Sequence, residues 1–269
     1  MNQKLARIDK GNGEIIIFVH GTPTSSAEYE NVIDSLSQSY RCIAFDHLGF
    51  GKSAKPIDGD YSLKAHQERF LEFLKELNLS SFHLVCHDFG AVIALSAILT
   101  TTLRPQSITI LNSWLWPLIE TEQQLKKQEW LVRSGIMPAL YRYFNFSPRV
   151  LLKLAWGKKK QLSKDRHQFY MGAFPNSKSR EGPIAFLKAL FDFNNPVWQN
   201  YKKLSLLNNI PTLIIWGAQD KLLSIKNFER WKLEIPNAKL IVLDDVGHFV
   251  AEEDPDNFKA ILYKFIKNI

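Results

Sequence analysis

An aspartate stands at the point where a buried strand is expected to end. The segment LVCHDFG (residues 84–90) is apolar up to Asp88 and passes after Gly90 into AVIALSAIL, which has the composition of a buried helix. A reactive residue on a sharp turn between a strand and a helix, next to small residues, projects from the top of a sheet toward a substrate. Asp88 is therefore a candidate nucleophile.

A carboxylate nucleophile suits a particular kind of substrate. Attack by a serine alkoxide on a saturated carbon would leave an ether, which an adjacent base cannot hydrolyse. Attack by Asp88 leaves an ester, and a histidine-activated water can hydrolyse its carbonyl group. The aspartate therefore points to an electrophilic saturated carbon with a leaving group, as in an alkyl halide or an epoxide, and away from ordinary ester or amide substrates.

Two residues later in the chain could complete this chemistry. Asp220 follows the strand-like TLIIWG (212–217), and His248 follows the strand-like KLIVL (239–243). His248, with a near-neutral pKa, would draw a proton from water in the second step. Asp220 would hold the tautomer of the histidine and stabilise the imidazolium ion. We therefore predict a triad of Asp88, Asp220 and His248.

The elements that must position these residues alternate along the chain. Near-continuous apolar runs are typical of a parallel sheet covered on both faces, and helical spacing of apolar residues predicts helices between them. The alternation predicts an α/β domain with right-handed crossovers. The predicted strands are 14–19, 40–45, 82–87, 107–112, 212–216 and 239–243, and the clearest helices are 62–79, 91–99 and 255–266.

The alternation breaks between about Trp114 and Tyr201. This segment holds five of the seven tryptophans, several prolines and helical patterns, without a convincing buried strand. It is too long and too apolar for an ordinary loop. We therefore predict a core formed by residues 1–113 and 202–269, with a helical cap at 114–201.

The ordered motifs resemble those of the α/β-hydrolases. HGTPTSS (20–26) resembles their oxyanion-hole loop, FDHLGFGKSAKP (45–56) their D-x-x-G-x-G-x-S loop, and CHDFG (86–90) their nucleophile elbow. The chain order of nucleophile, acid and histidine is also theirs. With an aspartate nucleophile and with FYMGAFPNSKSREGP (169–183) in the cap, the chain most resembles the haloalkane dehalogenases.

This resemblance implies a hydrolase that acts on a small apolar substrate through a covalent ester at Asp88. The backbone N–H groups of Thr22 and Phe89 would form the oxyanion hole for the tetrahedral intermediate. No metal ion and no organic cofactor has a role in such a reaction. Some dehalogenases carry the triad acid after the sixth strand, where this chain has Asn112, so Asp220 is the predicted acid.

The resemblance also implies a mostly parallel sheet whose first strands are shortened. Only about thirteen residues precede the strand that ends at His20, whereas this fold usually begins with a two-stranded hairpin. We expect at least one N-terminal strand to be missing or rudimentary, which leaves about seven strands.

The resemblance is weakest at the leaving-group site. Haloalkane dehalogenases bind the halide with a tryptophan after the nucleophile, together with an asparagine after His-Gly or a second tryptophan from the cap. This chain has Phe89 and Thr22 at those first two positions, and a phenyl ring has no N–H to donate. The replacement donor could be the Thr22 hydroxyl or an indole of Trp114, Trp116, Trp130 or Trp156. The residues expected to line the pocket are Thr22, Phe89, Trp114, Tyr170 and Phe174.

Three alternative functions stay open. An epoxide hydrolase would need a cap tyrosine to protonate the ring oxygen, and Tyr141, Tyr143 and Tyr170 lie in the predicted cap. A hydrolase of strained rings such as β-lactones would use the same nucleophile. A ligand-binding protein that kept the fold without turnover would have no need of a complete triad.

Several of these residues also have purely structural interpretations. Asp88 could cap the helix that follows it. His20 is expected to order the oxyanion-hole loop, and His87 is expected to make a structural hydrogen bond. Asp46 and Ser53 are expected to stabilise their own turn.

The composition favours a soluble protein with a small-molecule substrate. Of the 269 residues, 45% are hydrophobic, which is enough for one large core and a pocket. Lys and Arg exceed Asp and Glu by 34 to 27 without clustering, apart from Lys158 to Lys160, which argues against nucleic-acid binding. Cys42 and Cys86 lie in strand-like runs, so neither a disulfide nor a thiolate metal site is expected. With no targeting segment and no membrane-spanning run, we expect a cytoplasmic monomer or dimer that binds its substrate and water.

Overall fold

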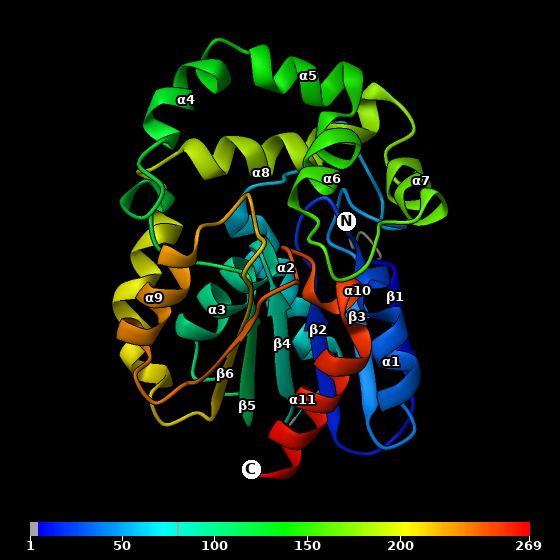
Figure 1. Cartoon of the computed structure of the whole chain (residues 1–269), viewed down its shortest axis with the longest axis vertical. Coiled ribbons are helices and arrows are strands. Elements are labelled where there is room, and N and C mark those ends of the chain that lie inside the picture. The colour runs from blue at the N-terminus through cyan, green and yellow to red at the C-terminus, as the bar shows by residue number, and fades with distance from the viewer. Residues whose placement is uncertain (1–4, 80) are drawn as a thin grey trace.

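A seven-stranded sheet forms the centre of the computed structural model, which describes residues 5–79 and 81–269 (Figure 1). The strand order is β1-β3-β2-β4-β5-β6-β7. β1 pairs antiparallel with β3, and the other five pairings are parallel. The strands are β1 (Arg7–Lys10), β2 (Ile15–Val19), β3 (Arg41–Phe45), β4 (His83–His87), β5 (Ser107–Leu111), β6 (Thr212–Gly217) and β7 (Lys239–Leu243).

The sheet confirms the predicted fold class and the six predicted strands. β1 is the expected rudimentary strand: it has 4 residues and is mostly exposed. Its sequence RIDK has no apolar run, so hydrophobicity could not reveal it. It forms because its backbone pairs with the edge of β3, from Arg7 opposite Phe45 to Lys10 opposite Cys42.

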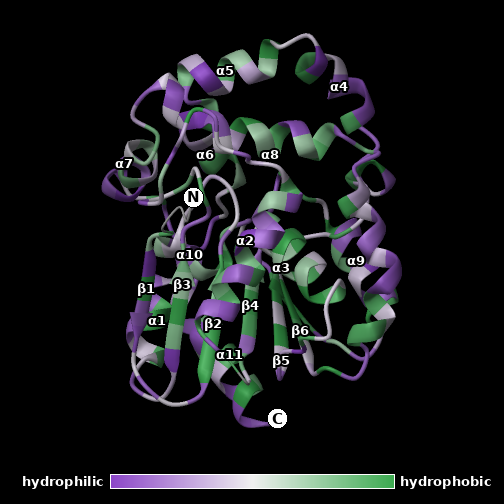
Figure 2. Ribbon diagram, turned by 180° about the vertical axis from the view of Figure 1, so that it is seen from behind, coloured by the Kyte–Doolittle hydropathy of each residue, from purple (hydrophilic) through white to green (hydrophobic). Residues whose placement is uncertain are grey.

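Helices cover both faces of the sheet because successive strand residues point to opposite sides. Ile17 of β2 and Leu84 of β4 belong to the core cluster with α2 and α3, whereas Ile16 and Val85 pack with α1 and α11. Figure 2 shows β4 and α3 as mainly hydrophobic, as expected for elements with no solvent-facing side. The core helices are η1 (Ser26–Tyr29), α1 (Glu30–Leu36), α2 (Leu63–Glu76), α3 (Phe89–Leu99), α9 (Ile225–Glu234), α10 (Val250–Glu253) and α11 (Pro255–Lys267).

The segment between β5 and β6 is helical, and α4, α5, α6, α7 and α8 lie together at one end of the sheet (Figure 1). The last helix of the segment, η5, packs Trp198 and Leu204 into the same core cluster as α3, and the domain boundary predicted at residue 202 falls inside it. The segment comprises η2 (Leu118–Glu120), α4 (Leu125–Arg133), α5 (Ile136–Phe144), the π-helical turn η3 (Ser147–Leu151), α6 (Leu152–Ala155), α7 (Lys164–Gly172), η4 (Ser177–Arg180), α8 (Glu181–Phe191) and η5 (Pro196–Leu207).

Two further observations concern the chain as a whole. Within the described ranges, no helix has the length and apolar character needed to cross a bilayer. Cys42 on β3 and Cys86 on β4 are both buried free thiols.

Candidate active site

Asp88 occupies a strained turn between β4 and α3. Its φ of 49° and ψ of −129° lie outside the regions favoured by residues with a side chain. A Cβ at Gly90 would lie 2.3 Å from the carbonyl oxygen of Val19, so only glycine allows α3 to start this close to β2. Asp88 stands at the N-cap position, but its side chain makes no capping hydrogen bond to α3. The carboxylate is therefore free for another role, and the simple capping interpretation of Asp88 is wrong.

The three predicted triad residues come together at the carboxyl ends of their strands. His248 Nδ1 lies 2.6 Å from Asp220 Oδ2, and His248 Nε2 lies 3.7 Å from Asp88 Oδ1. The side chains of His248 and Asp220 are both 1% exposed. The Nδ1–H of His248 donates to Asp220, which leaves Nε2 facing Asp88.

Asp220 is held by a set of donors that includes Asn112. Its Oδ1 accepts from the backbone N–H groups of Leu222 and Leu223, at 2.8 and 3.0 Å. Asn112 Nδ2 donates to Asp220 Oδ2 at 2.8 Å, and Asn112 Oδ1 accepts from Gly217 N at 2.8 Å. Asn112, which directly follows β5, therefore orients the carboxylate of Asp220. The sequence signal for this positioning role is the side-chain amide itself, because an amide can both donate and accept a hydrogen bond.

Burial and nearby charges shift the pKa of His248 in opposite directions. Burial disfavours the imidazolium ion, but the carboxylates of Asp220, Asp88 and Glu28 outweigh it and raise the pKa of His248 to about 9. Burial likewise opposes ionisation of Asp220, but the charge and hydrogen bond of His248 keep the pKa of Asp220 below its ordinary value. The near-neutral pKa predicted for His248 is thus wrong for the free protein, in which three acids surround the ring.

The loop that carries His248 is fastened to the cap. His248 N donates to the carbonyl oxygen of Ala155 at 2.9 Å. The buried carboxylate of Glu253 accepts from Gly157 N of the cap at 2.7 Å and from Gly247 N at 2.8 Å. Burial raises the pKa of Glu253, against the effect of these donors. Glu253 was not singled out in the sequence because acids are common in the first turn of a surface helix.

One of the two predicted oxyanion donors contacts the nucleophile. Thr22 N donates to Asp88 Oδ2 at 2.8 Å. A Cβ at Gly21 would lie 2.4 Å from the Asp88 side chain, so glycine is required for the loop to approach. Phe89 N makes no hydrogen bond to Asp88 in the described chain, and its role as a donor stays a prediction.

Aromatic rings close the site around the nucleophile elbow. The ring of Phe89 packs against Trp114 at 5.0 Å and against Phe186 of α8 at 4.6 Å between centroids. Phe50 links Phe186, at 4.9 Å, to Phe174, at 5.9 Å. The structure therefore brings the predicted pocket residues Phe89, Trp114 and Phe174 into one cluster. Phe50 and Phe186 were missed because a phenylalanine in a helix or turn is usually core.

Tyr170 was wrongly predicted to face the leaving group. It is fully buried in a separate cluster with Trp156 and Phe249, and its hydroxyl donates to Glu252. Arg166 lies over the ring at 5.0 Å. The Tyr170 hydroxyl is therefore engaged elsewhere.

Most other candidate donors are also engaged or exposed. Tyr143 and Trp130 are 66% and 59% exposed. The indole of Trp116 donates to Asn227 Oδ1 at 3.1 Å, and that of Trp156 to the carbonyl oxygen of Lys160. Among the tryptophans considered, this leaves Trp114 as the candidate.

His20 orders the backbone of its loop, and His87 makes a structural hydrogen bond to a side chain, as predicted. His20 Nε2 accepts from His47 N at 2.9 Å, and its Nδ1 lies 2.6 Å from Gly21 O. His87 Nδ1 lies 3.1 Å from Oε1 of the buried Glu28, and the His87 ring packs against His248 at 4.6 Å. The charge of His87 helps to keep the pKa of Glu28 below its ordinary value, although burial opposes this. An ionised acid therefore lies behind His248.

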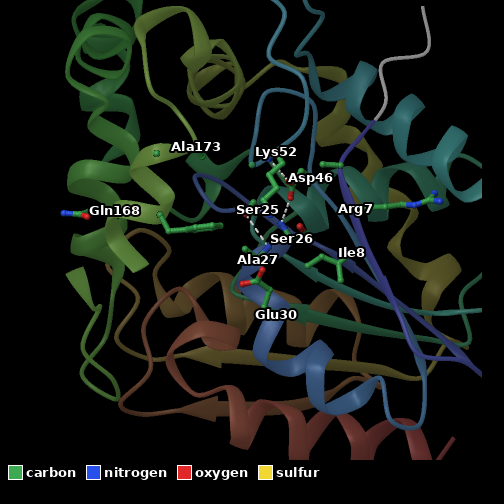
Figure 3. Close-up of a pocket in the computed structure, with 14 residues that line it drawn as sticks. Arg7, Ile8, Ser25, Ser26, Ala27, Glu30, Asp46, Lys52, Gln168 and Ala173 are labelled. Carbon is green, nitrogen blue, oxygen red and sulfur yellow. Dashed lines mark hydrogen bonds between the residues drawn. The ribbon is translucent and has the colours of Figure 1, made fainter. Parts of the chain in front are cut away.

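Asp46 and Ser53 stabilise their own turn, as predicted. Asp46 accepts from Ser26 N and from Lys52 N, both at 2.7 Å (Figure 3). Ser53 Oγ donates to Asp46 O at 2.7 Å. This turn borders a cavity of about 420 Å³ next to α7. Asp88, Asp220 and His248 do not line that cavity.

The fold and the site together define a class of protein. Residues 14–255 match the model of the alpha/beta hydrolase fold family. The chain belongs to this family.

Curated relatives cover almost the whole chain. A Shewanella oneidensis protein named cis-3-alkyl-4-alkyloxetan-2-one decarboxylase is 30% identical over 265 residues, which are 94% of this chain and 82% of the relative. Haloalkane dehalogenase 2 of Mycobacterium tuberculosis is 26% identical over 257 residues, 95% of this chain and 88% of the relative. Among solved structures, a putative ancestral haloalkane dehalogenase superposes with a TM-score of 0.88 at 24% identity, over 100% of this chain and 96% of the other. The structural similarity supports the fold, and the curated relatives include hydrolases.

Proposed function

We propose that this protein is a haloalkane dehalogenase-like hydrolase that forms a covalent alkyl ester at Asp88. One observation carries the proposal: Thr22 N holds Oδ2 of Asp88 at 2.8 Å, while Oδ1 faces His248 Nε2 at 3.7 Å. One oxygen is thus fixed by a backbone donor and the other is available for attack.

In the first step, Oδ1 of Asp88 attacks the saturated carbon of the substrate. The new C–O bond forms as the bond to the leaving group breaks, and the electron pair departs with the leaving group. The aromatic cluster around Phe89 limits access of water to the site, which favours a small apolar substrate and strengthens electrostatic interactions.

In the second step, neutral His248 takes a proton from water while the water oxygen attacks the ester carbonyl of Asp88. The negative charge that develops on Oδ2 is stabilised by Thr22 N, a contribution of roughly 3 to 4 kcal/mol for a well-placed donor. Collapse of the intermediate releases the alcohol and restores the carboxylate. Asp220 stabilises the imidazolium ion throughout.

A β-lactone is the second candidate substrate, because Phe89 cannot donate to a halide and two curated relatives are named as oxetanone decarboxylases. Asp88 would attack the ring carbon that bears the lactone oxygen, and the ring would open to an enzyme-bound β-carboxylate. Water can then hydrolyse the ester to a β-hydroxy acid. Alternatively, CO₂ leaves, its former C–C bond becomes the alkene bond, and Asp88 departs as the carboxylate.

An epoxide is less well supported than a halide or a lactone. Ring opening requires a hydroxyl group to protonate the oxygen. Of the predicted cap tyrosines, Tyr170 donates to Glu252 and Tyr143 is largely exposed. Tyr141 is buried, and burial together with the charge of Asp88 raises its pKa, which makes its phenol a weaker acid.

Product analysis with one substrate of each type tests the proposal. We expect 1-bromobutane to give butanol and bromide, or a cis-dialkyl β-lactone to give a hydroxy acid or an alkene. Asp88→Asn is expected to remove either activity. Tight binding of these compounds without any turnover would instead support a ligand-binding protein that kept the fold.

A further inference from the structure

The exposed apolar side chains of the protein are concentrated on the cap. Of the thirteen large hydrophobic residues that are exposed in the described chain, seven lie between residues 114 and 201. These seven include every exposed aromatic residue of the described chain, namely Trp130, Tyr143, Phe144 and Phe169. Single apolar residues scattered over a surface need no explanation, but exposed aromatic residues gathered on one part of a molecule indicate contact with another molecule.

α4 and α5 form the outermost layer of the cap, with α8 between them and the sheet (Figure 1, Figure 2). α5 packs on α8 through Tyr141, which belongs to the same buried cluster as Ile184. Ile136, Tyr143 and Phe144 of α5 are exposed instead. Because Tyr143 and Phe144 follow Ile136 by seven and eight positions, the three side chains lie along one face of the helix. This apolar face of α5 is left exposed by the described chain.

α4 places two cations next to its exposed tryptophan. None of its residues is buried. Lys126 and Lys127 precede Trp130 by four and three positions, a spacing that puts the three exposed side chains on one face of the helix. The one acidic residue of α4, Glu129, pairs with Arg133 at 2.6 Å. The two lysines therefore keep their charge without an acid partner on their own helix.

The excess positive charge of the protein also lies in the cap. Residues 114–201 contain 14 of the 34 Lys and Arg residues but only 6 of the 27 Asp and Glu residues, which is a net charge of +8. The rest of the chain has 20 basic and 21 acidic residues, a net charge of −1. The basic residues are scattered along the sequence, yet they are divided unevenly between cap and core. A partner of the cap is therefore expected to be anionic.

An anionic lipid bilayer fits both the charge and the apolar side chains. Trp and Tyr rings favour the boundary between headgroups and acyl chains, and basic residues are attracted to anionic headgroups. Ile136 and Phe144 would gain from contact with acyl chains, whereas a single-stranded nucleic acid offers mainly base faces for stacking. A second copy of the chain is disfavoured, because two cap surfaces with a net charge of +8 repel each other.

We infer that the outer cap surface docks on anionic membranes. This surface consists of the exposed side chains Lys126, Lys127, Trp130, Ile136, Tyr143 and Phe144. The apolar side chains enter the headgroup region while the two lysines contact anionic headgroups. Apolar molecules concentrate in bilayers, so docking brings the cap next to a source of such molecules. Docking itself does not depend on the reaction proposed above.

The fluorescence of Trp130 tests the docking without an added label. Trp130 is 59% exposed, whereas the other six tryptophans are at most 9% exposed. The full chain is mixed with vesicles of phosphatidylserine and brominated phosphatidylcholine, which quenches tryptophan on contact. We expect the protein to sediment with these vesicles and to be partly quenched, and both effects should weaken at high salt or without phosphatidylserine. Trp130→Phe should abolish the quenching while the protein still sediments.

Paired substitutions separate the two contributions to docking. Lys126→Gln with Lys127→Gln should weaken binding to the anionic vesicles about 10-fold or more, because each lysine near such a surface contributes about fivefold. Tyr143→Ser with Phe144→Ser should weaken it by about 10-fold through loss of apolar contact. Since all four side chains are exposed, the melting temperature should stay close to that of the unchanged protein.

The matched control is an exposed site on the core. Leu233 and Lys232 of α9 are both exposed, so Leu233→Ser with Lys232→Gln removes an apolar side chain and a charge outside the cap and should leave binding unchanged. A chain that does not bind anionic vesicles, or that loses binding equally through the α9 and outer cap substitutions, would overturn the inference. A dimer that the outer cap substitutions dissociate, or tighter binding to single-stranded RNA than to vesicles, would also overturn it.

Discussion

His248 Nε2 lies 3.7 Å from Asp88 Oδ1, although His248 Nδ1 is only 2.6 Å from Asp220 Oδ2. The histidine is thus bonded to its acid but only close to the nucleophile. This separation suits a base that acts on water rather than on the nucleophile itself, because Asp88 needs no deprotonation by His248. His248 is therefore expected to act in the second step, the hydrolysis of the Asp88 ester.

The pH dependence of the second step follows from the charges around His248. The base must be neutral, and Asp88 is one of the charges that raise the pKa of His248 to about 9 in the free protein. Esterification removes that charge, so the pKa falls below about 9. We expect the rate of ester hydrolysis to rise with pH above the ordinary histidine value of 6.5 and to level off before about 9. Rapid-quench measurement of the ester would show this, and a rate that falls over the same range would contradict it.

Replacement of His248 should trap the covalent ester. His248→Phe removes the base without removing the nucleophile, so hydrolysis should slow by about 100-fold to 10,000-fold. Intact-protein mass spectrometry should then show the added alkyl group. His167→Phe is the control, because the one hydrogen bond of the His167 ring within the described residues is to the carbonyl oxygen of Pro148, in the cap. Normal turnover by His248→Phe would argue against its role.

Loss of Asn112 should weaken both the site and the fold. Asn112→Ala leaves Gly217 N without its acceptor and removes one of the two donors to Asp220 Oδ2, which keeps the hydrogen bond from His248 Nδ1. Because both groups are buried, the free energy of unfolding should fall by about 1 to 3 kcal/mol. Urea denaturation measures this change. Thr109→Val on β5, the strand that Asn112 directly follows, is the control and should change stability little, since Thr109 Oγ1 is buried without a partner among the described residues. Equal effects of the two substitutions would contradict the assigned role.

The contact between the cap and the His248 loop gives a further prediction. In Gly247→Ala, the new Cβ would lie 2.4 Å from Ala155 O and 2.4 Å from Gly157 N, both backbone atoms. The loop must move, so hydrolysis of the ester should slow and the melting temperature should fall. Gly172→Ala meets nothing within 4 Å and should stabilise α7 by about 0.5 to 1 kcal/mol. A Gly247→Ala protein as stable and active as Gly172→Ala would refute the contact.

The parts of the fold that follow from local pattern could be predicted. The six apolar strands and the helices around Phe70 and Phe258 have clear patterns in the sequence, and Asp88, Asp220 and His248 each follow a strand. The position of the rudimentary strand β1 could not be predicted, because three of its four residues are charged and the strand depends on pairing with β3.

The parts of the site that depend on packing between distant segments could not be predicted. The sequence gives no sign that Tyr170 would meet Glu252, which lies 82 positions away, rather than the leaving group. Nor does it place Glu28 and His87, 59 positions apart, in a buried pair behind His248. The raised pKa of His248 depends on this convergence of acids.

The proposed reaction depends on the formation of an ester at Asp88. A single turnover in water enriched in ¹⁸O, with any substrate that yields an alcohol or a hydroxy acid, tests it most directly. Water attacks the carbonyl of the ester, so mass spectrometry should find one heavy oxygen in the peptide that contains Asp88. The product of that first turnover should carry none from the solvent. An unlabelled Asp88 together with a labelled product would mean that water attacks the substrate itself, and would contradict the formation of an ester at Asp88.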